Sequence, residues 1–266
     1  MSKIEVNGVE LFYEVKGQGE EVVVFLNGIA MATDHWNIQT ATFRENYQVL
    51  LHDFRGQGKS SKNTENISFK QHADDLNQII EQLEIEQIHL VGVSYGAEVA
   101  MHFAIFYPEK VKSLTLGTAV SQVRPLLAGM AEAWRDAAAT YDGKLFFNVM
   151  APFVYSDTFY QEKKDWLDQR AEIFGKVATK EWFDAFVALC NNFLTLDITD
   201  SLDKIQAPTL IVAAEKDILK PPTEHKVLVE RIPDTRFEIV EDAGHALFLE
   251  KGKEFNKLIL DFIADI

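Results

Sequence analysis

Residues 92–96 read Gly-Val-Ser-Tyr-Gly and match the pattern G-x-S-x-G. An apolar stretch typical of a buried strand leads into them, and a helical pattern follows directly. A sharp turn from strand to helix strains the central residue and leaves space only for very small residues at positions 92 and 96. Such a turn would present the Ser94 hydroxyl as a nucleophile and aim the Tyr95 N–H at a developing oxyanion. The competing interpretation is an ordinary glycine-containing turn with a buried serine.

A serine nucleophile needs a general base, and the base needs an acid that orients it. Seven histidines could supply the base. His245 differs from the others because it lies in a loop, residues 242–246, between the last expected strand and the last expected helix. The carboxyl ends of strands are where open α/β sheets build their sites. The other histidines lie in or beside strands and helices, where core or surface roles explain them equally well.

Two carboxylates compete for the orienting acid. Glu215 and Asp217 both follow an apolar stretch that ends at residue 214, so both are expected at the same edge of the sheet. We favour Asp217 because it lies further into the loop.

Short apolar runs predict the strands that carry these loops. They cover residues 21–26, 47–51, 87–93, 113–116, 207–214 and 236–240. Helical patterns lie between them, and the clearest begins at Ser68, where Ser68 and Gln71 match a capping box. Strands that alternate with helices predict an α/β fold with a mostly parallel sheet covered on both faces. Residues 9–15 predict an antiparallel strand at the edge of that sheet.

Residues 121–202 interrupt this alternation. They show helical periodicity without a buried strand, and they contain 14 of the chain's 30 aromatic residues. We therefore expect a core formed by residues 1–120 and 203–266, with residues 121–202 inserted as a helical cap. The aromatic residues fit an apolar substrate pocket and the packing of a helical cap equally well.

Composition limits the classes of function. The chain has 266 residues, 47% of them hydrophobic, and a formal net charge of −15. Its size and apolar content allow a large packed core, and its charge argues against nucleic-acid and anionic-membrane partners. It lacks an apolar run long enough to span a membrane and the HExxH and CxxC metal motifs, and its first residues lack the apolar run typical of a signal peptide. With one cysteine, these features predict a cytoplasmic protein without a metal or cofactor.

Three further segments carry a resemblance to the α/β-hydrolase superfamily. Residues 53–60, Asp-Phe-Arg-Gly-Gln-Gly-Lys-Ser, match that family's D-x-R-G-x-G-x-S loop. Residues 217–221 resemble its acid loop, and residues 244–250 resemble its histidine loop and the helix that follows. Over essentially its whole length, the chain resembles the serine esterase, haloperoxidase-like and meta-cleavage-product hydrolase branches. The order of serine, aspartate and histidine along the chain is also the family's.

The resemblance implies an eight-stranded, mostly parallel sheet flanked by helices, with a helical cap. It implies that Ser94, Asp217 and His245 are catalytic, and that the N–H groups of Tyr95 and Ile29 form the oxyanion hole. Asn27 stands where the family usually has histidine, so the contacts of that loop are an open question. The candidates for the substrate pocket are Met31, Trp134, Phe153 and Leu219.

Four other polar residues are assigned structural roles. Asp53 and Arg55 are expected to brace their loop as a charged pair. Glu98 lies in the first turn of the helix after Ser94, where a carboxylate suits the helix dipole. Cys190 is expected to be a small residue of the core.

These features favour a serine hydrolase that cleaves a carboxylic ester or a related acyl bond of a small molecule. Serine at position 94 argues against the dehalogenase and epoxide hydrolase branches, which use aspartate there. One alternative is an acyltransferase or thioesterase acting on hydroxyacyl thioesters, because residues 27–33 resemble the N-G…A-T loop of such enzymes. The other is a hydrolase-fold ligand receptor or regulator without turnover. The natural substrate and the oligomeric state are not predicted.

Overall fold

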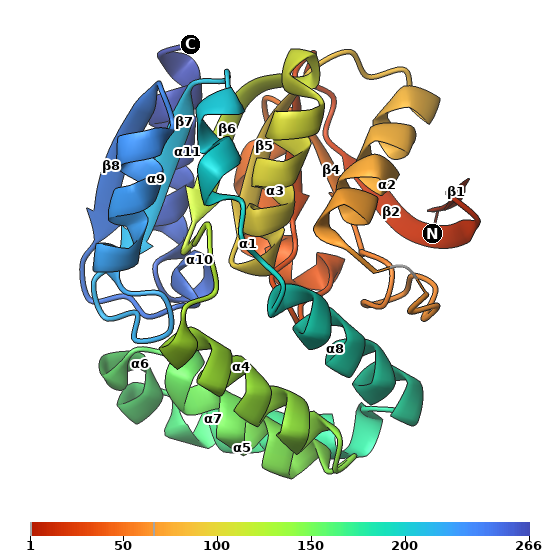
Figure 1. Ribbon diagram of the computed structural model, residues 1–266, viewed down its shortest axis with the longest axis vertical. Coiled ribbons are helices and arrows are strands. Elements are labelled where there is room, and N and C mark those ends of the chain that lie inside the picture. The colour runs from red at the N-terminus through yellow and green to blue at the C-terminus, as the bar shows by residue number, and fades with distance from the viewer. Residues whose placement is uncertain (1, 66) are drawn as a thin grey trace.

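The computed structural model describes residues 2–65 and 67–266, and an eight-stranded sheet forms its centre (Figure 1). The strand order is β1-β2-β4-β3-β5-β6-β7-β8. The strands are β1 (Ser2–Val6), β2 (Val9–Lys16), β3 (Val22–Leu26), β4 (Gln48–His52), β5 (Ile88–Val93), β6 (Val111–Gly117), β7 (Thr209–Ala214) and β8 (Thr235–Val240). β2 pairs antiparallel with β1 and β4, and the remaining pairs are parallel. The predicted fold class is confirmed.

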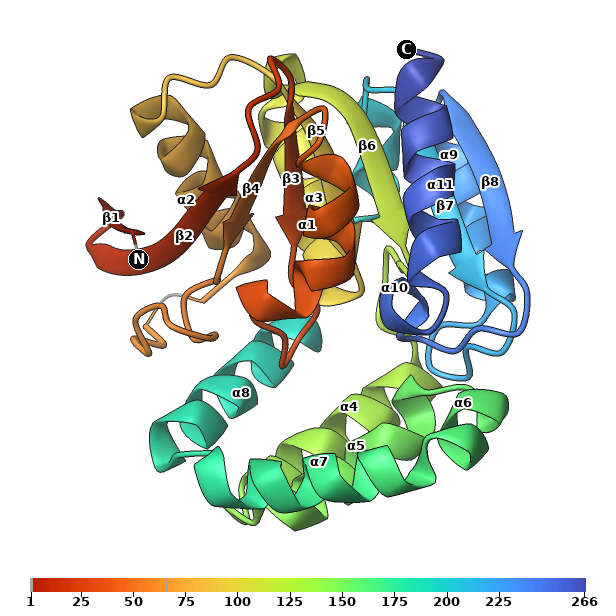
Figure 2. The same ribbon diagram turned by 180° about the vertical axis from the view of Figure 1, so that it is seen from behind.

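Helices cover both faces of the sheet (Figures 1 and 2). One face packs against α2 (Phe69–Gln82), α3 (Tyr95–Phe106) and α9 (Lys226–Arg231), and the other against α1 (Asn37–Phe43) and α11 (Gly252–Ala264). β3 shows why a doubly covered strand is apolar throughout. Val22, Val24 and Leu26 join the first core, while Val23 and Phe25 join the second. Shorter helices complete the framework: η1 (Thr33–Trp36), η2 (Pro108–Lys110), η3 (Thr199–Lys204), η4 (Pro222–His225) and α10 (Leu247–Glu250).

The prediction for the edge of the sheet is partly wrong. Residues 9–15 do form an antiparallel strand, but β1 lies outside it and is the edge. β1 is mostly exposed, so it lacks the apolar run by which the other strands are predicted. The turn that joins β1 to β2 is Asn7-Gly8, both with positive φ, which is a strong hairpin signal.

The chain between β6 and β7 is helical, as predicted. It forms α4 (Pro125–Ala138), α5 (Gly143–Val154), α6 (Asp157–Glu162), α7 (Lys164–Val177) and α8 (Lys180–Phe193). Figure 2 shows these helices gathered beyond the carboxyl ends of the parallel strands. Many of the aromatic residues pack on one another, as Phe146 does on Trp182 and Phe186. No helix in residues 2–65 and 67–266 is long and apolar enough to cross a membrane.

Three buried histidines should make stability depend on pH. Burial lowers the pKa of His72 to about 3, and the pKa values of His52 and His225 to about 4, from an ordinary value of 6.5. Between pH 6.5 and about 4 the unfolded chain therefore binds more protons than the folded one. Stability should fall on acidification through this window, each histidine contributing up to about 1.4 kcal/mol per pH unit.

Urea unfolding measured at intervals between pH 7 and pH 5 checks this expectation. His52→Leu removes one of the three titrating groups, so its slope against pH should be smaller by about one proton. An unchanged slope in that variant would show that the buried His52 ring does not resist protonation.

Candidate active site

Ser94 lies at the turn between β5 and α3 with φ +52° and ψ −123°. The two neighbouring glycines make this turn sterically possible. A Cβ atom on Gly92 would lie 2.3 Å from the Gly96 carbonyl oxygen, and one on Gly96 would lie 2.3 Å from the Leu26 carbonyl oxygen. A larger residue at either position would force the strand and the helix apart. The local geometry is that of a nucleophile elbow.

Ser94, His245 and Asp217 form a continuous chain of hydrogen bonds. The Ser94 Oγ lies 2.8 Å from His245 Nε2, and His245 Nδ1 lies 2.7 Å from Asp217 Oδ2. Because Nδ1 faces a carboxylate, it carries the proton and donates, which leaves Nε2 free to accept the serine hydrogen. No other histidine in the described parts of the chain hydrogen-bonds Ser94.

The loop after β7 holds the aspartate in place. Asp217 is buried, and its Oδ1 accepts the backbone N–H groups of Leu219 and Lys220, both at 2.8 Å. Its other oxygen, Oδ2, is left to face His245. Glu215, the competing carboxylate, is exposed and accepts the backbone N–H of Asp242 instead. The geometry therefore brings Asp217, and not Glu215, to the imidazole.

Two backbone amides lie beside the serine. Tyr95 is the first residue of α3, so its N–H has no partner within its own helix. Ile29 lines the same cavity as Ser94 and Tyr95. Gly28 brings the Ile29 loop close to the nucleophile, since a Cβ on Gly28 would lie 3.6 Å from the Ser94 Cβ.

Asn27 anchors the loop that carries Ile29. Its buried amide nitrogen donates to the His52 carbonyl and to Asp53 Oδ1, both at 3.2 Å. Its carbonyl oxygen accepts the Trp36 indole N–H at 2.8 Å. The departure from the family's usual histidine therefore leaves a fully bonded loop anchor.

The expectation that Asp53 and Arg55 pair with each other is wrong. Asp53 accepts the backbone N–H groups of Thr33 and Lys59, at 2.7 and 2.8 Å. Arg55 reaches α2, where it forms a buried bidentate pair with Asp75 at 2.7 and 2.8 Å. Each side chain therefore braces the loop with a different partner: Asp53 holds backbone N–H groups, and Arg55 holds a carboxylate of α2.

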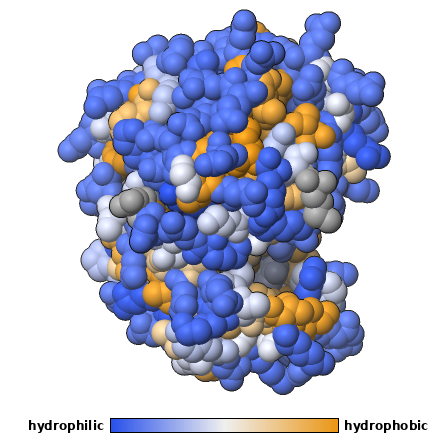
Figure 3. All heavy atoms as spheres, turned by 90° about the vertical axis from the view of Figure 1, so that its right-hand side faces the viewer, coloured by the Kyte–Doolittle hydropathy of each residue, from blue (hydrophilic) through white to orange (hydrophobic). Residues whose placement is uncertain are grey.

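A small cavity, with an accessible volume of about 20 Å³, lies beside Ser94. Two of the pocket candidates, Trp134 and Leu219, line it, whereas Met31 and Phe153 do not. Met31 places its sulfur against the Gly28 N–H at 3.1 Å, and Phe153 packs its ring on Trp134. The lining is almost entirely apolar, and the residues that line the cavity with Ser94 are Ile29, Tyr95, Leu127, Ala131, Trp134, Cys190, Phe193, Leu219 and Lys220. Figure 3 shows the surface hollowed between the sheet core and the helical insertion, with apolar side chains along the lower edge of the hollow.

Sequence reasoning missed much of this lining, although a signal was present. Leu127, Ala131 and Trp134 recur at the spacing of one helix face on α4. Cys190 and Phe193 do the same on α8. Cys190 is buried, as expected of a small core residue, and it also lines the cavity.

The side chain of Tyr95 connects the elbow to two helices. Its Oη accepts a hydrogen bond from Asn192 Nδ2 of α8 at 2.7 Å. It also lies within hydrogen-bonding distance of His72 Nε2 of α2, at 3.0 Å. Burial raises the pKa of Tyr95 well above its ordinary value, so the hydroxyl keeps its proton. The amide beside the nucleophile therefore belongs to a residue whose side chain is held from both sides.

Glu98 and Lys220 form a buried ion pair in the wall of the cavity. Lys220 Nζ lies 2.9 and 3.0 Å from the two carboxylate oxygens, and both side chains are almost completely buried. Glu98 also accepts the Val120 N–H at 3.0 Å. Burial raises the pKa of Glu98, while Lys220 opposes that shift. Glu98 thus supports the structure by pairing with a distant lysine, beyond any effect on the helix dipole.

Lys220→Met should reduce the free energy of unfolding by about 3–5 kcal/mol, because it leaves a buried carboxylate without its partner. Glu98 can avoid this cost by binding a proton, so the loss should be larger at pH 8 than at pH 5. Urea unfolding at both pH values measures it. The double variant Glu98→Gln, Lys220→Met should recover most of the loss, and a single variant as stable as the native protein would contradict the prediction.

The described residues contain no cluster of three or more histidine, cysteine or acidic side chains that could hold a metal ion. The chemistry that the arrangement can perform on its own is nucleophilic attack by a serine, with proton transfer through an imidazole.

Comparison with known proteins shows which family this chain resembles in sequence and in fold. Residues 21–252 match the family described as the alpha/beta hydrolase fold. The crystal structure of MGS-M2, an alpha/beta hydrolase enzyme from a Medee basin deep-sea metagenome library, is 32% identical, with a TM-score of 0.95. That similarity covers 99% of this chain and 97% of the other.

Two curated relatives are more distant. RutD of Azorhizobium caulinodans, named as a proposed carbamate hydrolase, is 26% identical over 97% of this chain and 96% of its own. The 3-oxoadipate enol-lactonase 1 of Acinetobacter baylyi is 23% identical over 97% of this chain and 95% of its own. The family match spans most of the chain, and the fold and the elbow agree with it. The protein therefore belongs to the α/β hydrolase family.

Proposed function

We propose that this protein is a serine hydrolase that cleaves small carboxylic esters, including cyclic ones, through an acyl-serine intermediate. The observation that carries the proposal is the hydrogen-bonded chain from Ser94 through His245 to Asp217. Ser94 also borders a small cavity with an almost entirely apolar lining, which suits the acyl part of an ester. The relatives named as a carbamate hydrolase and an enol-lactonase support hydrolysis of an acyl bond.

In the proposed reaction, Ser94 Oγ attacks the ester carbonyl while His245 Nε2 takes its proton. The N–H groups of Tyr95 and Ile29 stabilise the oxyanion. His245 then protonates the departing alcohol, and Asp217 stabilises the imidazolium and keeps the ring oriented. A water molecule deprotonated by His245 attacks the acyl-serine, which releases the acid and restores the serine.

The proposal assigns residues 121–202 the role of a cap over the site. α4 and α8 supply Leu127, Trp134, Cys190 and Phe193 to the cavity beside Ser94. Because these side chains bound a small and apolar space, compact acyl groups should be preferred over long ones.

A panel of p-nitrophenyl acetate, butyrate and decanoate tests the activity and the size limit together. We expect multiple turnovers, with kcat/KM for butyrate exceeding that for decanoate by about tenfold or more, because forcing a long chain into a small, well-packed space costs about 1–3 kcal/mol. A γ-lactone included in the panel tests cyclic esters.

The same assay separates the alternative functions. An acyl thioester supplied with an alcohol should yield mainly free acid, and a predominance of the new ester would identify an acyltransferase. Release of no more than one equivalent of product per protein, across all substrates, would contradict the enzymatic proposal and favour a receptor.

A further inference from the structure

The loop that carries His245 is held from outside by the helical insertion. Residues 241–246 connect β8 to α10, and two backbone N–H groups flank the histidine. Ala246 N–H donates to the Val154 carbonyl at the end of α5, at 2.9 Å. Gly244 N–H donates to Glu250 Oε2 at 3.2 Å. One flank therefore contacts the insertion directly, and the other contacts it through Glu250.

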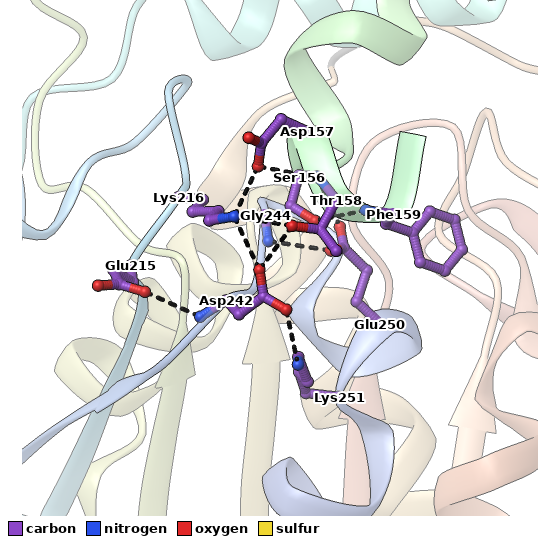
Figure 4. Close-up of polar contacts among 10 residues, drawn as sticks. All are labelled: Ser156, Asp157, Thr158, Phe159, Glu215, Lys216, Asp242, Gly244, Glu250 and Lys251. Carbon is purple, nitrogen blue, oxygen red and sulfur yellow. Dashed lines mark hydrogen bonds and ion pairs between the residues drawn. The ribbon is translucent and has the colours of Figure 1, made fainter. Parts of the chain in front are cut away.

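Glu250 joins the loop and the insertion with one carboxylate. Its Oε1 accepts the Ser156 backbone N–H at 3.1 Å, and its Oε2 accepts the Ser156 hydroxyl at 2.6 Å. Ser156 is 1% exposed, so water does not compete for this hydroxyl. Hydrogen bonds to a charged acceptor are shorter and stronger than neutral ones. Figure 4 shows Glu250 beside Gly244 and Ser156, below the start of α6.

The backbones of the His245 loop and the insertion pack closely against each other at Gly244. A Cβ on Gly244 would lie 2.3 Å from the Ser156 nitrogen, so glycine is needed where the two backbones meet. Any displacement of Ser156 relative to Gly244 would therefore act on the residue next to His245.

A chain of ion pairs lies beside this contact (Figure 4). Lys216 Nζ lies 2.7 Å from Asp157 and 2.8 Å from Asp242, and Thr158 donates to Asp242 at 2.8 Å. Lys216 and Asp157 remain substantially exposed, with 34% and 69% of their side-chain surfaces accessible. Exposed pairs of this kind contribute little to stability, because water screens the two charges. The contact through Glu250, which ends on the buried Ser156, is therefore the stronger link.

We propose that Glu250 is a positioning residue. It couples the insertion's corner, residues 154–158, to the His245 loop, and so keeps the imidazole aligned with Ser94 and Asp217 only while that corner is docked. The catalytic consequence rests on the proposed function, whereas the effect on the imidazole can be measured without a substrate.

Glu250→Ala removes all three acceptor contacts. We expect kcat to fall by about 10- to 100-fold with KM changed less than about threefold, since small misplacements of a catalytic group have effects of this size. Glu250→Gln keeps a carbonyl oxygen for one N–H, so it should retain more activity than the alanine variant. Asp157→Asn, which removes only an exposed pair at the same corner, should stay within about twofold of the native kcat.

Ser156→Ala provides a second variant should Glu250→Ala fail to fold. It removes the hydroxyl contact to Glu250 but leaves Gly244 bound, and it also removes the cap of α6. Thr179→Ala is the matched control, because Thr179 caps α8 in the same way, away from the histidine loop. Only the Ser156 variant should lower kcat.

The position of the imidazole is measured by ¹⁵N NMR of the His245 ring in the native protein and these variants without substrate. The hydrogen-bonded Nδ1–H signal should broaden or shift in Glu250→Ala and Ser156→Ala, and not in Asp157→Asn or Thr179→Ala. This pattern supports positioning even if the protein hydrolyses no ester, in which case only the proposed function fails. An unchanged signal and kcat in Glu250→Ala, with only a lower Tm, would overturn the inference.

Discussion

Ser94→Ala is expected to lower kcat for ester hydrolysis by about 10⁴- to 10⁶-fold, the range seen when a triad nucleophile is removed. The variant loses the hydroxyl that hydrogen-bonds the His245 imidazole and borders the apolar cavity. The fold should survive, because the backbone N–H of residue 94 still donates to the Gly117 carbonyl at 2.9 Å. Steady-state kinetics, with circular dichroism and urea unfolding on the same samples, measure both quantities.

Ser113 offers a matched control. It is a buried serine on β6, and its Oγ lies 2.7 Å from His89 Nδ1, so it too forms a serine–histidine pair. It lies within a strand, however, and not at an elbow beside the cavity. Ser113→Ala should keep kcat within about twofold. Comparable losses in the two variants would mean that the assay reports stability and not the loss of a nucleophile.

Asp217→Asn is expected to lower kcat by about 10⁴-fold with a small change in KM, as the same substitution does in a serine protease triad. The amide oxygen of the variant would accept the Leu219 and Lys220 N–H groups, which now bind Oδ1. Its NH₂ group would then face His245 Nδ1 and favour the tautomer that carries the proton on Nε2. An imidazole in that state cannot accept the proton of Ser94.

Glu215→Gln tests the competing carboxylate in the same loop. Its contact with the Asp242 N–H survives in an amide, and it does not touch the imidazole, so activity should change less than about threefold. A large loss here, with activity retained in Asp217→Asn, would exchange the roles of the two residues. Rates and KM values for both variants across pH 6 to 9 supply the comparison.

The sequence predicts the sheet well where burial is two-sided. Every residue of β3 is buried, so the strand appears as an unbroken apolar run. The elbow is also predictable, because close backbone approach demands glycine at positions 92 and 96. β1 was not predicted, because most of its residues are exposed and it therefore has no apolar pattern. A strand can therefore be predicted from the local sequence when both of its faces are buried, and is easily missed when most of it is exposed.

The partners of charged side chains are harder to predict from the sequence. Arg55 pairs with Asp75, twenty residues away, and Lys220 pairs with Glu98, 122 residues away. No local spacing relates such pairs, since the tertiary fold alone brings them together. The same holds for the cavity, whose walls come from α4, α8 and the loops after β3 and β7.

The candidate site also has a part that the local sequence predicts and a part that only the tertiary fold determines. His245 can be distinguished from the other six histidines because it lies in a loop that follows a strand of the parallel sheet. The contact of that loop with Ser156 depends on how the insertion folds back, which periodicity within residues 121–202 does not specify. Glu250 therefore became a candidate only with the structure.

Labelling with a fluorophosphonate tests the central claim most directly, because the probe reacts with a serine only when a base and an oxyanion hole activate it. The modified residue is identified by mass spectrometry of the digested protein. We predict stoichiometric modification at Ser94, abolished in Ser94→Ala and strongly slowed in Asp217→Asn. Modification of a different residue, or native protein that hydrolyses esters yet stays unlabelled at Ser94, would contradict the assignment.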